Sequence, residues 1–142
     1  MMLKEKIRPL TLCIIKNKDR VLVSDGYDSK KGEVFYRLLG GGIEFGETGE
    51  EALNREFNEE LDTELENVKY LTTLENIFTY NGKRGHEIVM IFTADLAKKD
   101  LYQKASLDIL DSKDGHKGSW QKIEDFKKNK LVLYPNGIVN FI

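Results

Sequence analysis

The chain has 142 residues, of which 40% are hydrophobic and 32% charged, and its formal net charge is −2. These values are typical of one globular domain with one core, so we expect residues 1–142 to form a single domain. The near-neutral charge argues against non-specific binding to nucleic acid, and no apolar run approaches the roughly 20 residues that a membrane span needs.

The first predicted elements are strands. Leu10 to Ile15 (LTLCII) and Arg20 to Ser24 (RVLVS) are apolar runs separated by the turn-like KNKD, which predicts a hairpin. A third strand is predicted from Val34 to Leu39, directly before three glycines. The lone Cys13 lies in the first run and cannot form an intrachain disulfide. We therefore expect it in the core, and the protein in a reducing cytoplasm, because the N-terminus also lacks the apolar segment of a signal peptide.

A helix is predicted after the glycines. Thr48 and Glu51 have the spacing of a capping box, and Glu50 also suits the positive end of a helix dipole. The helix should end at about Leu61.

The second half of the chain mixes strands and helices. The segments 68–80 and 86–96 predict a long hairpin around NGKRG, whereas 97–119 is polar and unassigned. A short strand and then a helix are predicted within 120–130. A last helical turn should pack three side chains, Ile138, Val139 and Phe141. This order predicts an α/β fold with a mixed sheet and helices on its faces.

The predicted helix carries two distinct faces. At about 100° per residue, one stripe is apolar and consists of Leu53, Phe57 and Leu61. Glu56, Glu59 and Glu60 cluster on a neighbouring face, where three carboxylates can converge on one point. Hard cations such as Mg2+ or Mn2+ prefer oxygen ligands of this kind. The alternative is a solvated charged face that is steadied by an ion pair between Arg55 and Glu59.

Glycines lie at the start of this segment. Gly40, Gly41 and Gly42 follow the third strand directly. Glycine permits φ > 0 and a close approach of the backbone to a ligand, and its peptide groups can add to a metal or phosphate site. A plain strand-to-helix loop is the alternative. Together with the carboxylates, however, the glycines indicate one site.

The whole segment resembles the signature of the Nudix hydrolase family, G-x5-E-x7-R-E-U-x-E-E-x-G-U, where U is a bulky apolar residue. The matching residues are Gly41, Glu47, Arg55, Glu56, Phe57, Glu59 and Glu60. Asp62 replaces the last glycine and Thr63 the last apolar residue, which affects the helix end, where aspartate tolerates the left-handed conformation. Upstream, YRLLGGGIEFGE is similar to the family's aromatic-x-L-P-G-G-G-x-E-P-G-E, with Leu39 and Phe45 in place of the prolines.

The resemblance implies a Nudix-type α/β/α sandwich with a mixed central sheet. It also implies a metal-dependent pyrophosphohydrolase, which uses Mg2+ or Mn2+ and cleaves a nucleoside diphosphate linked to another moiety X by water attack on phosphorus. Since X is not specified, the substrate is a nucleoside triphosphate, a diadenosine polyphosphate, ADP-ribose or a nucleotide sugar. The expected partner is a small-molecule nucleotide, with no membrane and no nucleic acid, and a homodimer is compatible with the family. The alternative is a non-catalytic Nudix module that binds a nucleotide.

The resemblance also implies site residues. The metal ligands are the backbone carbonyl of Gly40 or Gly41 and the side chains of Glu56, Glu59, Glu60 and one loop aspartate. For the aspartate we prefer Asp114 over Asp108 and Asp111. Glu56 is a metal ligand or the base that takes the proton of water, and Arg55 orients it. Glu47 lies near the metals, through water or through Arg55.

Substrate contacts are expected from cationic and aromatic side chains. The candidates for binding phosphate are Arg37, Lys83 and Arg84, and those for stacking on a base are Phe35, Tyr36, Phe78 and Tyr80. Aromatic residues are more often part of a core or a sheet surface than a nucleobase platform, so both alternatives stay open for each of them.

Overall fold

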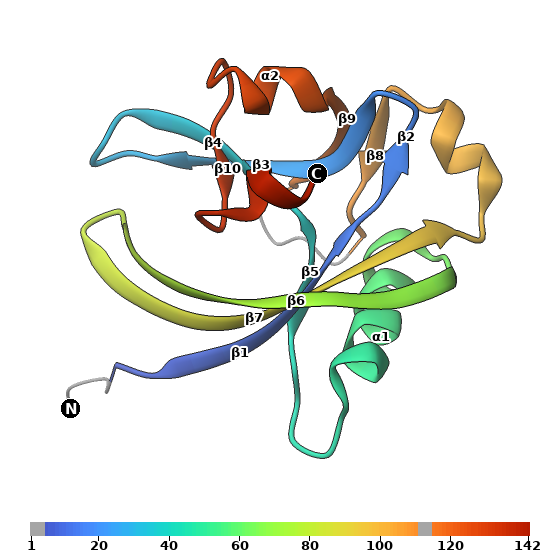
Figure 1. The fold of residues 1–142 in the computed structure, drawn as a ribbon, viewed down its shortest axis with the longest axis horizontal. Coiled ribbons are helices and arrows are strands. Elements are labelled where there is room, and N and C mark those ends of the chain that lie inside the picture. The colour runs from blue at the N-terminus through green and yellow to red at the C-terminus, as the bar shows by residue number, and fades with distance from the viewer. Residues whose placement is uncertain (1–4, 111–114) are drawn as a thin grey trace.

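The computed structural model describes residues 5–110 and 115–142, in which the strands form two sheets (Figure 1). The first sheet has four strands in the order β5-β1-β7-β6. Their bounds are Leu39–Gly42 for β5, Ile7–Ile14 for β1, Lys83–Leu96 for β7 and Leu65–Tyr80 for β6. Strand β1 runs antiparallel to β5 and parallel to β7, so this sheet is mixed.

The second sheet has six strands in the order β10-β4-β3-β9-β8, with β2 paired to β3. The strands, in chain order, are β2 (Lys16–Asn17), β3 (Arg20–Asp28), β4 (Glu33–Arg37), β8 (Ser106–Asp108), β9 (Lys117–Lys122) and β10 (Leu133–Tyr134). The hairpins β3–β4 and β6–β7 extend toward the same side of the molecule (Figure 1). The fold class predicted from the sequence, an α/β sandwich, is confirmed, and its strands divide between these two sheets.

Helices cover the sheets on opposite sides. Helix α1 (Gly49–Leu61) packs against β1 and β5, and α2 (Ile123–Lys127) against β9. Two 3-10 helices, η1 (Lys99–Gln103) and η2 (Ile138–Phe141), complete the elements. In the described ranges, no helix is long and apolar enough to cross a membrane.

The predicted first hairpin is correct only at its turn. Lys16 pairs with Val21 and Asn17 with Arg20, but β1 itself belongs to the other sheet. Its partner β7 lies far along the chain, at a register of Leu10 against Val89. The two strands of the predicted hairpin therefore diverge into different sheets.

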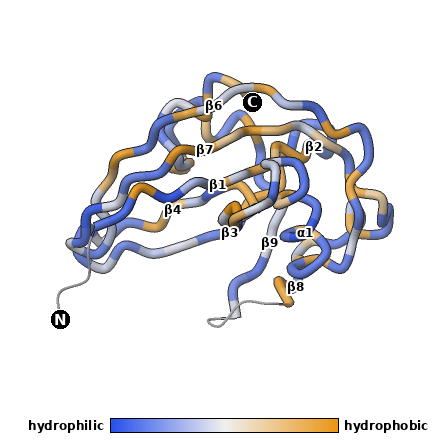
Figure 2. The backbone as a smooth tube through the Cα atoms, turned by 90° about the horizontal axis from the view of Figure 1, so that it is seen from below, coloured by the Kyte–Doolittle hydropathy of each residue, from blue (hydrophilic) through white to orange (hydrophobic). Residues whose placement is uncertain are grey.

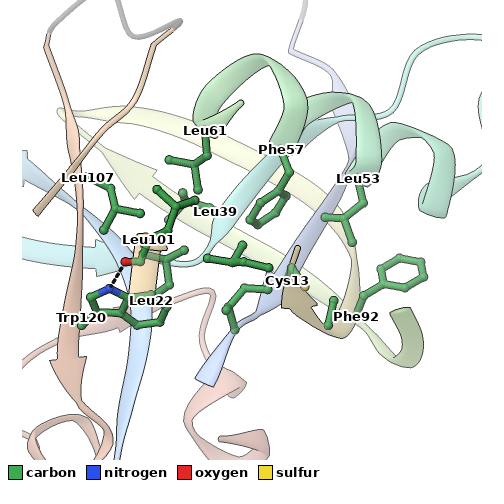
Figure 3. Close-up of a cluster of buried hydrophobic side chains, with 13 residues drawn as sticks. Cys13, Leu22, Leu39, Leu53, Phe57, Leu61, Phe92, Leu101, Leu107 and Trp120 are labelled. Atoms are coloured by element: carbon green, nitrogen blue, oxygen red, sulfur yellow. Dashed lines mark hydrogen bonds between the residues drawn. The ribbon is translucent and has the colours of Figure 1, made fainter. Parts of the chain in front are cut away.

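The core has two parts, one on each face of the four-stranded sheet. The apolar stripe of α1 packs on Cys13 and Phe92, and Trp120 donates from Nε1 to the carbonyl of Leu101 at 3.2 Å (Figure 3). The second part lies between the sheets and includes Leu10, Val89 and Phe126. Along the chain, the central strands are largely hydrophobic, whereas α1 is largely hydrophilic (Figure 2). This contrast reflects the single buried stripe of the helix.

Cys13 is fully buried, and this burial raises the pKa of its thiol well above the usual range. The thiolate is therefore disfavoured, which agrees with the predicted role of a small core residue.

The ends of α1 follow local rules. Thr48 Oγ1 accepts from the amide of Glu51 at 3.1 Å, and the Glu51 carboxylate accepts from the amide of Thr48 at 2.9 Å, so the capping box is present. Asp62 ends the helix with φ 52° and ψ 45°, in the left-handed region where the family signature has glycine. Buried Thr63 accepts from the amide of Lys98 at 3.1 Å. Both departures from the signature are thus accommodated in the fold.

The predicted last helical turn is present as η2, which begins after Gly137. Ile138 is fully buried and Val139 packs against the core between the sheets. Phe141, however, is 40% exposed, so its predicted packing is wrong. A 3-10 turn has three residues per turn, which places Phe141 on the same edge as Ile138 but at the free end of the turn.

Candidate active site

Arg55 organises the acidic face of α1. Its Nε donates to Glu47 Oε2 at 2.7 Å and its Nη2 to Glu47 Oε1 at 2.9 Å, which makes a two-point contact. Nη2 also donates to the carbonyl of Gly42 at 2.9 Å. Nη1 reaches Glu56 Oε1 at 3.0 Å and Glu59 Oε2 at 3.4 Å. One guanidinium therefore ties the loop before the helix, strand β5 and two helix carboxylates together.

The carboxylate of Glu56 lies against the backbone of Gly41. A Cβ at position 41 would lie 2.4 Å from Glu56 Cδ and 2.5 and 2.6 Å from its two oxygens. Only glycine leaves room for this side chain, which is 16% exposed. The glycines were predicted to follow a strand, with a plain loop as the alternative reading; they belong to strand β5, where Gly40 pairs with Leu12 and Gly41 with Thr11.

The remaining predicted metal ligands are less closely gathered. Glu59 is half-exposed and turned toward Arg55, while Glu60 lines a small cavity together with Gly40 and Gly41. Within 5–110 and 115–142, no three His, Cys, Asp or Glu side chains are arranged to hold a metal ion. The predicted convergence of the three helix carboxylates on one point is therefore not seen among these residues.

The predicted loop aspartate lies largely outside what the structure describes. Asp114 and Asp111 fall in the range that is not described. Asp108 is exposed at the end of β8 and pairs with Lys117 at 2.9 Å, an ion pair that lowers the pKa of its carboxyl.

The contact with Arg55 also sets the protonation of Glu47. The hydrogen bonds from Arg55, together with the amide of Glu44 at 2.9 Å, lower the pKa of Glu47 to about 2. In turn, Glu47 followed by Glu56 raises the pKa of Arg55 above its usual range. Both groups stay charged near neutral pH.

This shift predicts a pH dependence of stability. A carboxylate whose pKa is depressed by folding contributes stability above its unfolded pKa, near 4.5, and loses it as the pH falls toward about 2. Glu47→Gln has no such carboxylate. The melting temperature of the wild type should therefore exceed that of the variant at pH 6, and the gap should narrow between pH 4.5 and pH 2. Thermal melts followed by circular dichroism at several pH values measure the difference between the two melting temperatures. A difference that stays constant from pH 4.5 to pH 2 would contradict the contact between Glu47 and Arg55.

Two hollows that share lining residues lie beside this site. The smaller, of about 240 Å³, is lined by Gly40, Gly41 and Glu60. The larger is a cleft of about 800 Å³ between the hairpins β3–β4 and β6–β7. Arg8 and Arg37 line both. A ligand that spans the two hollows would therefore pass these two guanidinium groups.

The predicted substrate residues divide into two groups. Arg37 and Tyr80 line the cleft, where Tyr80 meets Phe35 edge to face at 5.7 Å. Tyr36 is not part of that lining and packs on Phe126 instead, because neighbouring residues of a strand face opposite sides and Phe35 already faces the cleft. Arg84 also lies away from the cleft lining and pairs with Glu5 at 3.7 Å.

The cleft contains residues that the sequence analysis did not single out. Asn76 and Glu87 are both buried, and both line it. The sequence did contain one signal for Glu87. This residue opens the run EIVMIF, in which the other positions that face the inside of the sheet are apolar.

The chain is thus an α/β sandwich whose acidic helix faces a glycine-rich strand. The model of the NUDIX domain family matches residues 6–137. The chain belongs to the Nudix hydrolase family, which confirms the resemblance seen in the sequence.

Similar proteins give the same family. The NAD-capped RNA hydrolase NudC of Edwardsiella ictaluri is 32% identical over 96 residues, which cover 68% of this chain and 34% of that protein. NudC of Photobacterium profundum is 28% identical over 90 residues, 63% of this chain and 31% of that protein. The chain thus spans about a third of the length of these relatives.

Solved structures share the fold. A MutT Nudix hydrolase from Burkholderia pseudomallei has a TM-score of 0.62 at 23% identity and covers 84% of this chain and 86% of its own. A Nudix hydrolase from Nitrosomonas europaea has a TM-score of 0.66 at 16% identity and covers 95% of this chain and 85% of its own.

Proposed function

We propose that residues 1–142 form one Nudix domain that uses a divalent metal ion to hydrolyse a nucleoside diphosphate joined to another group X. The observation that carries this proposal is the Arg55 network. It holds Glu47 and Glu56 in fixed positions, with the Glu56 carboxylate against Gly41, a residue that lines the small cavity.

The donor set fits Mg2+ or Mn2+. The carboxylates of Glu56, Glu59 and Glu60 and the carbonyl of Gly40 are hard oxygen ligands, and Glu56 occupies a space that any Cβ at position 41 would fill. These groups would hold the ion, with Asp114 as a further ligand. When bound, the ion supplies a Lewis acid that offsets diphosphate charge and acidifies a water molecule.

The chain's own residues orient the reaction. Arg55 fixes the rotamer of Glu56, and Glu47 in turn fixes Arg55 through two hydrogen bonds. Glu56 is then either a ligand of the ion or the base that accepts the proton of the attacking water. Arg37 lines both hollows, which supports its proposed contact with phosphate oxygens.

Tyr80 lines the cleft, so the nucleoside is proposed to lie between the two hairpins. The proposed substrate classes are a nucleoside triphosphate, a diadenosine polyphosphate, ADP-ribose and a nucleotide sugar. Its two NudC relatives are named for NAD-capped RNA, which adds that class to the substrates worth testing.

We propose that the partner is a small nucleotide and that the setting is cytoplasmic, which the buried lone thiol of Cys13 supports. The protein is proposed to be a monomer or a homodimer, and light scattering would distinguish the two.

A substrate panel tests the proposal. The protein is incubated with each substrate class, NAD-capped RNA included, in Mg2+, in Mn2+ and in excess EDTA. We expect turnover of one class with the metal and none with EDTA. Metal-dependent nucleotide binding without turnover of any class would favour the alternative, a non-catalytic binding module.

A further inference from the structure

A row of polar side chains crosses the inner face of the four-stranded sheet. Arg8 of β1 pairs in register with Glu87 of β7, which pairs in register with Asn76 of β6. One step further along the sheet, the same three strands contribute Leu10, Val89 and Leu74 to the apolar core between the sheets. The core therefore ends, and the cleft begins, at this polar row.

Glu87 and Asn76 are closely packed within the row. The Glu87 side chain is only 6% exposed, and its Oε1 accepts from Asn76 Nδ2 at 3.2 Å. Its Oε2 faces Arg8 Nη1 at 3.9 Å, a distance too long for a hydrogen bond, and the Arg8 side chain is largely exposed. Among residues 5–110 and 115–142, the buried Asn76 Oδ1 has no hydrogen-bond partner.

The orientation of the Asn76 amide follows from chemistry. Glu87 faces a guanidinium, so its carboxylate acts as an acceptor, and only the amide nitrogen of Asn76 can donate to it. The oxygen of Asn76 must then point elsewhere. Among the described residues, the row thus offers two acceptors: Asn76 Oδ1, which is buried without a hydrogen-bond partner, and Glu87 Oε2, which faces Arg8 Nη1 at 3.9 Å. A buried acceptor such as Asn76 Oδ1 destabilises a fold unless a donor reaches it.

We propose that Asn76 and Glu87 select the nucleobase in the cleft, and that they favour a base edge with two neighbouring N–H donors. Among the common bases, guanine has such an edge, with its ring N1–H beside its exocyclic amino group. Adenine and cytosine have an amino group beside a ring acceptor, and uracil has one N–H between two carbonyls. Hypoxanthine keeps the ring N–H of guanine and lacks the amino group. An acceptor pair discriminates among these edges because the wrong edge leaves a buried acceptor unpaired.

Aromatic side chains complete the proposed base site. Phe35 meets Tyr80 edge to face at 5.7 Å and Tyr134 at 5.5 Å, and all three line the cleft. Their rings provide apolar surface for the flat faces of a base, which leaves its hydrogen-bonding edge to the polar row. This selection rests on the proposed function, since it concerns the base of the hydrolysed nucleotide.

Binding of nucleoside monophosphates tests the selection without turnover, because these compounds have no phosphoanhydride to hydrolyse. Guanosine, inosine and adenosine monophosphate are titrated into the full chain and followed by NMR. The wild type should bind the guanosine compound at least about tenfold more tightly than the other two. Equal affinity for all three in the wild type would overturn the proposal, and this comparison does not depend on the folding of any variant.

Two variants in the cleft test which residues select the base. The ratio compared is the affinity for guanosine monophosphate divided by the affinity for inosine monophosphate. In Glu87→Gln and in Asn76→Leu, this ratio should come to within about threefold of one. Glu75→Gln is the matched control: it lies next to Asn76 but is exposed on the other face of β6, and its ratio should equal that of the wild type. A full guanosine preference retained in both cleft variants would assign the selection to other residues and overturn the proposal.

Hydrolysis of guanosine and inosine triphosphate in Mg2+ separates this inference from the proposed function. Turnover of both at equal kcat/KM would overturn the base selection and leave the hydrolase intact. A guanosine preference among monophosphates, without turnover of any nucleotide, would support the base site and contradict the hydrolase.

Discussion

Replacing Glu56 by glutamine is expected to lower kcat/KM by about 10²- to 10⁴-fold, the range typical of losing a catalytic acid or base. Glutamine keeps the size of the side chain, so it should still fit against Gly41 in the position that the carboxylate now occupies. It removes the negative charge that Arg55 Nη1 contacts at 3.0 Å, and with it either a metal ligand or the proton acceptor. Steady-state hydrolysis of the substrate found in the panel measures the loss.

Two controls are needed to interpret the activity of Glu56→Gln. Glu50→Gln, on the first turn of the same helix and exposed to solvent, should hydrolyse the substrate within about twofold of the wild type. The melting temperature of Glu56→Gln should stay close to that of the wild type, which excludes unfolding as the cause. Wild-type activity in Glu56→Gln would show that the acidic face of α1 is not the reaction site.

The second large effect is expected from a single methyl group. In Gly41→Ala, the new Cβ would lie about where the Glu56 carboxylate now is, with Cδ only 2.4 Å away. Since the carboxylate is the far end of a flexible side chain, the fold can adjust by moving Glu56. A displacement of about 1 Å in a catalytic group can cost about 10²-fold in rate. We therefore expect kcat/KM to fall by about 10- to 100-fold while the free energy of unfolding changes little.

The neighbouring residue provides the comparison. In Gly40→Ala, the Cβ would lie 2.0 Å from the carbonyl oxygen of Thr11 and 2.9 Å from Leu12 Cα, both backbone atoms, at a φ of +148°. The backbone cannot yield as a side chain does, so the pairing of β5 with β1 must shift. We expect a loss of about 3 kcal/mol or more in the free energy of unfolding, measured by urea denaturation. Equal stability losses in the two variants would contradict the distinction between a site glycine and a fold glycine.

The local elements of this fold were predictable because local chemistry specifies them. The capping box places the start of α1 at Thr48, and Asn81-Gly82 joins β6 to β7 at the predicted turn. The pairing of β1 with β7 was not predictable. Leu10 and Val89 are far apart in the chain, and the sequence of either strand does not specify which strand it pairs with. The sequence analysis placed the glycine run after a strand and not within one, since glycine is depleted in strands; in the structure it forms β5, pairs with β1 and leaves room for Glu56.

The candidate site shows a similar division. The family resemblance implied the contact of Arg55 with Glu56, and the i, i+4 spacing offered the ion pair of Arg55 with Glu59 as part of the alternative reading; the structure contains both. The choice between Tyr36 and its neighbour Phe35 depended on which face of β4 points into the cleft, which one short strand does not reveal. Asn76 and Glu87 were missed for a related reason, because their meeting depends on the register between two strands.

The most direct test of the metal site is a titration of the purified protein with Mn2+, followed by electron paramagnetic resonance without any nucleotide. We expect the wild type to bind Mn2+, Glu59→Gln to bind it about 10- to 100-fold more weakly, and Glu50→Gln to bind it as the wild type does. Identical Mn2+ affinity in all three proteins would contradict the assignment of the ion to the acidic face of α1.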